Sequence, residues 1–176
     1  PGGPDHLFSP TAGGGLSLAV ARGFEHTDCK PAVHCVQPTG NNTIAGPLRA
    51  GEERAQTSRG DTAISALQIA NVIDGNETLA ACRATGGTGY LVSDEEVFSA
   101  QARMAREEGI FSEPAGAIGL AGALDARTRG ELAPDAVVVC LVTGTGFKDD
   151  AAIERMLDGR SCPMVKSMTD FSEACL

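Results

Sequence analysis

A run of three glycines lies between an apolar segment and a helical one, and this arrangement is typical of phosphate binding. Residues His6–Ser9 predict a strand, Gly13–Gly15 follow it, and the pattern from Leu16 to Phe24 predicts a helix. Glycines let the backbone approach phosphate oxygens without Cβ clashes, and a helix N-terminus offers unpaired N–H groups. A plain tight turn is the alternative. No Gly-Lys-Ser/Thr follows, and Leu18 stands where a dinucleotide-binding pattern ends in glycine, so neither of those motifs applies.

Two further segments bring polar side chains to element ends. Pro114 after Glu113 predicts the start of a helix, because proline is favoured at the first helical position. Glu113 is therefore placed either to tune the charge of a ligand or merely to interact with the helix dipole. The apolar run from Ala136 to Val142 predicts a parallel strand covered on both faces, and it ends at Thr143. The Thr143 hydroxyl could contact a ligand or simply cap the strand.

The elements that position these residues alternate between short apolar runs and longer helical patterns. This alternation predicts an α/β fold with a mostly parallel sheet and flanking helices. Ser93 followed by Glu96 forms a capping-box pattern at a helix start. The other expected elements are strands at 32–36 and 89–92, helices at 77–83, 94–108 and from 114, and a long loop at 39–62.

Composition excludes several classes of function. The formal net charge of −9 argues against nucleic acid and against an anionic membrane surface. No run approaches the roughly 18 apolar residues of a membrane span, and the first residues lack a signal-peptide pattern, so a cytoplasmic location is expected. The 6 cysteines form no C-x-x-C pair, and no metal site is expected.

Three segments resemble one enzyme family. Ser9–Leu16 resembles the tetraglycine loop of fold type II pyridoxal-phosphate enzymes, with Ala12 in place of the first glycine. Glu107–Ala117 resembles the E-G-I-F-x-E-P-A segment of threonine synthases and serine/threonine dehydratases. Val139–Asp149 is similar to the threonine synthase signature ending in T-G-x-G-x-K-D. A weaker likeness joins the strand that ends in Gln37-Pro38 to a G-V-E-P strand, with Gln37 in place of the acid.

The resemblance implies part of the large domain of the fold type II fold, with pyridoxal 5′-phosphate as cofactor. The glycine loop would hold the cofactor phosphate, and Thr143 would meet the pyridine nitrogen. A neutral hydroxyl does not force that nitrogen to stay protonated, which suits β/γ-elimination or replacement better than transamination. The residues that the resemblance assigns to the cofactor are Ala12, Gly13, Gly14, Gly15, Leu16, Glu113, Thr143 and Gly144.

The lysine that carries the cofactor as a Schiff base in this family precedes the glycine loop, and no lysine here matches it. Lys30, Lys148 and Lys166 all lie outside such a segment. We therefore expect a carboxy-terminal part, with a cofactor-cradle domain at 1–157 and a tail at 158–176, that is inactive alone and carries no catalytic residue.

The complete enzyme is expected to act on a small hydroxy- or phospho-amino acid, as a homodimer or through association with an amino-terminal half. Two alternatives stay open. One is a non-catalytic phosphate-binding module or pseudoenzyme half. The other is a nucleotide-binding α/β domain, although no acidic residue is placed for a ribose.

Overall fold

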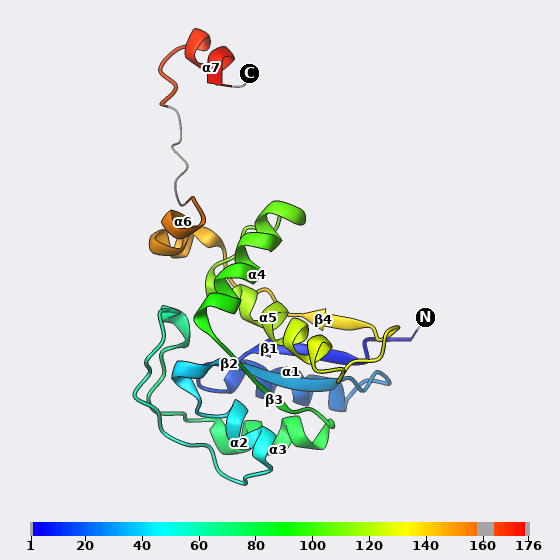
Figure 1. The fold of residues 1–176 in the computed structure, drawn as a ribbon. Coiled ribbons are helices and arrows are strands. Elements are labelled where there is room, and N and C mark those ends of the chain that lie inside the picture. The colour runs from blue at the N-terminus through cyan, green and yellow to red at the C-terminus, as the bar shows by residue number, and fades with distance from the viewer. Residues whose placement is uncertain (1, 158–163, 175–176) are drawn as a thin grey trace.

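The computed structural model describes residues 2–157 and 164–174 and has the expected α/β architecture. Its four strands form one parallel sheet in the order β3-β2-β1-β4 (Figure 1). The strands are β1 (His6–Pro10), β2 (Ala32–Pro38), β3 (Gly89–Val92) and β4 (Val138–Cys140). The helices are α1 (Gly15–Glu25), α2 (Ala45–Ala50), α3 (Gly75–Ala84), α4 (Asp94–Glu107), α5 (Pro114–Thr128), α6 (Asp150–Met156) and α7 (Met168–Ala174), with 3₁₀ turns η1 (Thr39–Asn41), η2 (Ser65–Leu67) and η3 (Gly146–Lys148).

Each face of the sheet is covered by its own set of helices. Successive strand residues point to opposite faces, so neighbouring residues of one strand join different apolar clusters. In β1, Leu7 belongs to an apolar cluster that includes residues of α1, α2 and α3, whereas the next residue, Phe8, belongs to a cluster that includes residues of α4 and α5. The two apolar clusters therefore lie on either side of one sheet. The chain leaves β1 into α1 on one face and reaches β4 from α5 on the other, which is the arrangement that opens a crevice at the carboxyl ends of neighbouring parallel strands.

The prediction that the strand over Ala136–Val142 is covered on both faces is wrong for the described residues. β4 spans only Val138–Cys140 and lies at the edge of the sheet. One face of β4 packs against α5, but on the other face Val137 and Val139 are 52% and 36% exposed. Within residues 2–157 and 164–174, no further strand pairs with the outer edge of β4. An apolar run specifies a strand, but the cover over each face depends on which elements pack there.

The local signals for helix starts are confirmed. Ser93 Oγ accepts from Glu96 N at the start of α4, and the Glu96 carboxylate accepts from Ser93 N, so the capping box is complete. Pro114 is the first residue of α5. The loop expected at 39–62 contains only η1 and α2.

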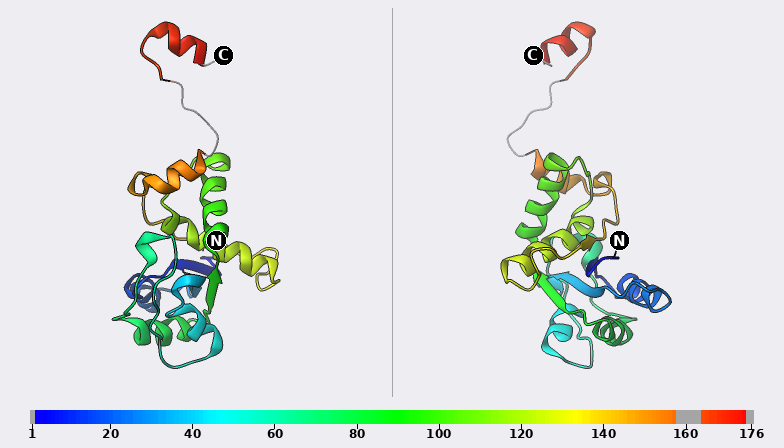
Figure 2. Two further views of the ribbon diagram at one scale, coloured as in Figure 1. Left: turned by 60° about the vertical axis from the view of Figure 1, so that its left-hand side comes forward. Right: turned by 90° about the vertical axis from the view of Figure 1, so that its right-hand side faces the viewer.

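The end of the chain holds two helices that we did not expect. α6 is capped by the Asp149 carboxylate, which accepts from Ala152 N. α7 lies well apart from the sheet in both views of Figure 2. Residues 158–163 and 175–176 of the expected tail lie outside the described part of the chain. No helix of the described residues is long and apolar enough to cross a membrane.

Candidate cofactor site

A cavity of about 200 Å³ opens at the carboxyl ends of β1 and β4. Four segments line it: the glycine loop after β1, two residues of η2, the start of α5, and Thr143, three residues beyond the end of β4. These positions meet because β1 and β4 are parallel neighbours whose carboxyl ends share one edge. The lining residues are Pro10, Ala12, Gly13, Gly14, Gly15, Leu16, Ala66, Leu67, Glu113, Ala115 and Thr143.

The glycine loop has a conformation that only glycine adopts easily. Gly14 has φ +106°, a region that costs an L-residue energy, and its carbonyl accepts the first helical hydrogen bond of α1 from Leu18 N at 3.0 Å. A Cβ on Gly14 would collide with Thr78 Oγ1 and would lie 3.2 Å from the Asp74 carbonyl. By contrast, a Cβ on Gly13 would meet no atom within 4 Å. The loop is thus shaped by Gly14, while Gly13 borders open space.

The first turn of α1 keeps N–H groups available to a ligand. No side chain caps Gly14, the N-cap residue, and the first turn contains no acidic residue. The first N–H groups of a helix have no partner within the helix, and the helix dipole makes that end positive. The arrangement therefore suits an anion such as a phosphate group.

A chain of buried hydroxyls lies beneath the loop and fixes its two ends. Thr11 Oγ1 lies 2.8 Å from Ser17 Oγ, and Ser17 Oγ donates to Ser9 Oγ at 2.9 Å. All three side chains are fully or almost fully buried. These hydroxyls link the end of β1 to the first turn of α1. They therefore fix the two ends of the loop without using any group that faces the cavity.

Gln37 anchors the loop from the neighbouring strand. Its Oε1 atom accepts from the backbone N–H groups of Thr43, Ile44 and Ala45 at 2.7–3.1 Å. Its Nε2 atom donates to Thr43 Oγ1 at 2.7 Å and to the Ala12 carbonyl at 3.4 Å. An acid at this position could accept the same three bonds but could not donate to Ala12. The amide therefore ties the start of α2 to the glycine loop.

The segments around Glu113 and Thr143 pack directly on each other. Glu113 N donates to the Gly144 carbonyl at 3.0 Å, and Gly146 N donates to the Phe111 carbonyl at 3.1 Å. A Cβ on Gly144 would collide with the Glu113 carboxylate, and one on Gly146 would lie 2.5 Å from the Phe111 ring. Both glycines are thus needed for this close contact, and the two sequence motifs form one structural unit.

The structure brings together all the predicted site residues except Gly144, which supports Glu113 from behind and does not line the cavity. Sequence reasoning missed Ala66 and Leu67 in η2, which complete the lining. They lie just after the loop that we expected at 39–62, and a small residue next to a leucine gives no signal of a binding role.

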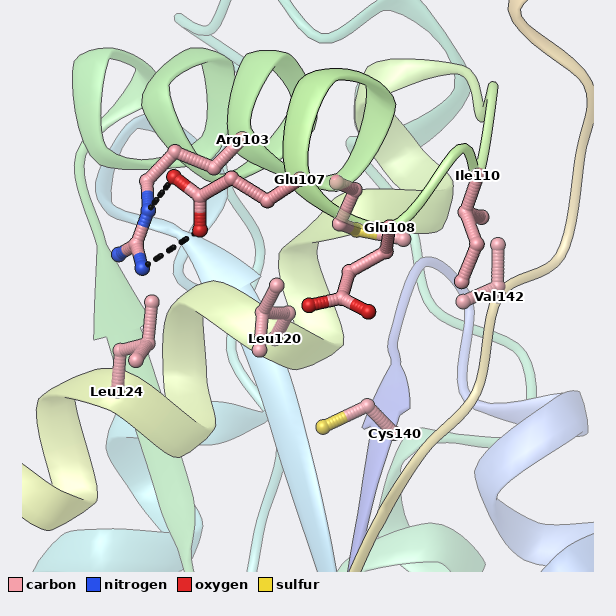
Figure 3. A pocket seen from close by; sticks show the side chains of 9 residues that line it. Arg103, Glu107, Glu108, Ile110, Leu120, Leu124, Cys140 and Val142 are labelled. Carbon is pink, nitrogen blue, oxygen red and sulfur yellow. Dashed lines mark hydrogen bonds and ion pairs between the residues drawn. The ribbon is translucent and has the colours of Figure 1, made fainter.

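A larger cavity of about 360 Å³ lies between α4, α5 and the end of β4 (Figure 3). In Figure 3, Arg103 and Glu107 pair with each other on α4, while Leu120 and Leu124 face them from α5. Burial raises the pKa of the Cys140 thiol to about 11, so this thiol stays protonated and poorly nucleophilic at neutral pH. The larger cavity combines apolar side chains with Glu108 and with Arg103, which is already paired with Glu107, and no loop of backbone N–H groups opens into it. The glycine cavity is therefore the better candidate site.

Comparison with known proteins shows the family of the chain. Residues 1–144 match the family described as pyridoxal-phosphate dependent enzyme. The chain belongs to this family. It is 32% identical to threonine synthase of Methanosarcina acetivorans and 37% identical to that of Synechocystis, covering 85% and 86% of this chain but only 39% of each relative. The chain thus spans well under half the length of these relatives.

Solved structures share the fold of this pyridoxal-phosphate enzyme chain. The processed form of threonine deaminase isoform 2 from Solanum lycopersicum superposes with a TM-score of 0.73, at 23% identity, over 90% of this chain and 45% of its own. A fungal L-serine ammonia-lyase from Rhizomucor miehei gives 0.65 at 24% identity, over 90% of this chain and 50% of its own. The residues of the glycine cavity suit the cofactor of the family. The loop around Gly14 and the uncapped N–H groups of α1 suit a phosphate group, and the Thr143 hydroxyl and the Glu113 carboxylate line the same cavity and suit the polar ring.

Proposed function

We propose that the glycine cavity binds pyridoxal phosphate and that this chain forms the cofactor cradle of a threonine synthase-like or threonine/serine dehydratase-like enzyme. The observation that carries the proposal is the convergence of the glycine loop, Glu113 and Thr143 on one cavity, from three segments that lie far apart in the chain. The N–H groups of Gly13–Gly15 and of the first turn of α1 would bind the phosphate. Ala12 and Leu16 would border it, and Gly144 would support the opposite wall.

The chemistry follows from what lies opposite the phosphate site. Pyridoxal phosphate supplies an electron-withdrawing ring that stabilises negative charge at the α-carbon of an amino acid. The Thr143 hydroxyl would meet the ring nitrogen without forcing a proton onto it, because a hydroxyl can either donate or accept. The apolar side chains of Ala66 and Leu67 would keep water from that face of the ring. These features favour β/γ-elimination or replacement on a small hydroxy- or phospho-amino acid.

We propose that the lysine that carries the cofactor belongs to the amino-terminal part of the complete enzyme, which this chain does not include. None of the three lysines lines the cavity, although Lys148 contacts Glu113. We predict that borohydride reduction of the chain with pyridoxal phosphate labels no single lysine stoichiometrically, and that the chain alone gives no turnover. Stoichiometric labelling of Lys148, found by peptide mass analysis, would contradict this prediction. In the cell, the chain would act with an amino-terminal half or as a homodimer.

The experiment that tests cofactor binding is calorimetry with pyridoxine 5′-phosphate, which has the ring and the phosphate but no aldehyde and so cannot label lysines. We expect it to bind and inorganic phosphate to compete with it, while pyridoxine without phosphate binds much more weakly. If inorganic phosphate binds as tightly as pyridoxine 5′-phosphate, the ring contributes nothing. That result would favour the alternative of a non-catalytic phosphate-binding module.

A further inference from the structure

The Glu113 carboxylate is buried in the wall of the glycine cavity with one charged partner. Lys148 Nζ lies 3.0 Å from its Oε2 atom and 3.3 Å from Oε1. The Glu113 side chain is 8% exposed, whereas that of Lys148 is 59% exposed. Among the described residues, no other side chain or backbone group donates a hydrogen bond to this carboxylate. Lys148 is therefore the one charged side chain among the described residues that balances this carboxylate, and it does so from the solvent side, next to the positive end of the α5 helix dipole, because Glu113 is the N-cap residue of α5.

The fold fixes the place of this ion pair beside Thr143. Lys148 belongs to η3, which is held against the segment before α5 by the bond from Gly146 N to the Phe111 carbonyl and by the Phe111–Phe147 contact, with ring centroids 5.0 Å apart. The carboxylate rests against Gly144, where no side chain could fit. Both Glu113 and Thr143 face the cavity. Two oxygen-bearing side chains are thus available to a ring nitrogen at this end.

We propose that Lys148 is a positioning residue that holds the Glu113 carboxylate in the cavity wall, leaving the Thr143 hydroxyl to meet the ring nitrogen of pyridoxal phosphate. The inference rests on the function proposed above. A buried carboxylate that loses its cation is strongly destabilised and takes up another partner or a proton. A ring nitrogen in the same cavity is a base that can supply a positive charge. Lys148 therefore keeps the field of Glu113 from drawing a proton onto the ring.

The test measures the ring nitrogen directly, with no turnover. ¹⁵N-labelled pyridoxine 5′-phosphate is bound to the chain, and the ¹⁵N chemical shift is followed with pH to give the proton-binding equilibrium of the ring. In Lys148→Met we expect this equilibrium to shift toward the protonated ring by about tenfold, the effect of one unneutralised charge several ångströms away in a partly hydrated cavity. The same substitution in a Glu113→Gln background should have no effect, because Lys148 acts only through Glu113.

Two controls keep the comparison matched. Lys166→Met removes the same charge from an exposed position in the segment before α7 and should leave the ring unchanged. Lys148→Arg should keep the ion pair and the wild-type behaviour. In the chain without ligand, the losses of unfolding free energy in Lys148→Met and Glu113→Gln should be strongly non-additive, because the two side chains contact each other.

The outcomes separate this inference from the function on which it rests. If wild-type chain binds neither pyridoxine 5′-phosphate nor inorganic phosphate, the proposed function and the inference both fail. If the ligand binds but Lys148→Met matches Lys166→Met, only the inference fails. An effect of Lys148→Met that persists in the Glu113→Gln background, or additive unfolding free energies, would likewise overturn it.

Discussion

Replacing Gly14 by alanine should destabilise the folded chain, because the shape of the glycine loop depends on this residue. The backbone at φ +106° costs an L-residue roughly 1–2 kcal/mol. The added Cβ would also collide with Thr78 Oγ1, which cannot move freely because it is buried and donates to the Asp74 carbonyl at 2.7 Å. Forcing a methyl group into such a contact costs roughly 1–3 kcal/mol. Gly14→Ala should therefore lower the free energy of unfolding by about 3 kcal/mol.

The matched control is Gly13→Ala, at the preceding position. A Cβ there meets nothing within 4 Å, and φ is not positive, so the free energy of unfolding should change by less than about 1 kcal/mol. Because Gly13 borders the cavity, its methyl group should nevertheless weaken binding of pyridoxine 5′-phosphate. Urea unfolding and calorimetry measure the two properties. Equal stability losses in both variants, or full ligand affinity in Gly13→Ala, would refute the reasoning.

Three other predictions follow from groups around the site. Burial, with a smaller contribution from a neighbouring histidine, lowers the pKa of His34 from 6.5 to about 4, so the unfolded chain binds more protons between these values. The free energy of unfolding should fall by about 3 kcal/mol as pH drops from 6.5 to 4, and His34→Gln should flatten the profile measured by urea unfolding. Gln37→Leu leaves three backbone N–H groups without their acceptor and should lower the free energy of unfolding by roughly 3 kcal/mol or more, whereas Gln37→Glu should lower it clearly less. Equal losses of the two variants in urea unfolding would contradict the role assigned to Gln37. The open edge of β4 should make the chain self-associate in sedimentation experiments, and Val139→Lys should reduce this, whereas Ile73→Lys, at a 91% exposed position, should not.

The sequence predicts the parts of this molecule that depend on local chemistry. Gly14, the Ser93 capping box and Pro114 each act within a few residues of their own position, and the corresponding loop and helix starts are confirmed. The exposure of Val139 cannot be predicted from local chemistry, because the residues of β4 are as apolar as those of a covered strand. An uncovered face is expected at this strand only because the chain is read as one part of a larger enzyme.

Long-range hydrogen bonds were also beyond the reach of the sequence. Gln37 could be recognised as an unusual residue in its strand, but its bonds to the starts of two other segments depend on the fold. The pairing of Glu113 with Lys148 likewise joins residues 35 positions apart. The cap of α6 is different, since Asp149 before a helical pattern is a local signal that sequence reasoning could have used.

The most direct test of the cofactor site is a crystal structure of the chain grown with pyridoxine 5′-phosphate. We predict that the phosphate lies against the N–H groups of Gly13–Gly15 and that the ring extends toward η2, with its nitrogen within hydrogen-bond distance of Thr143 Oγ1. Ligand bound elsewhere, or a glycine cavity that stays empty at saturating ligand, would contradict the proposal that this cavity is the cofactor cradle.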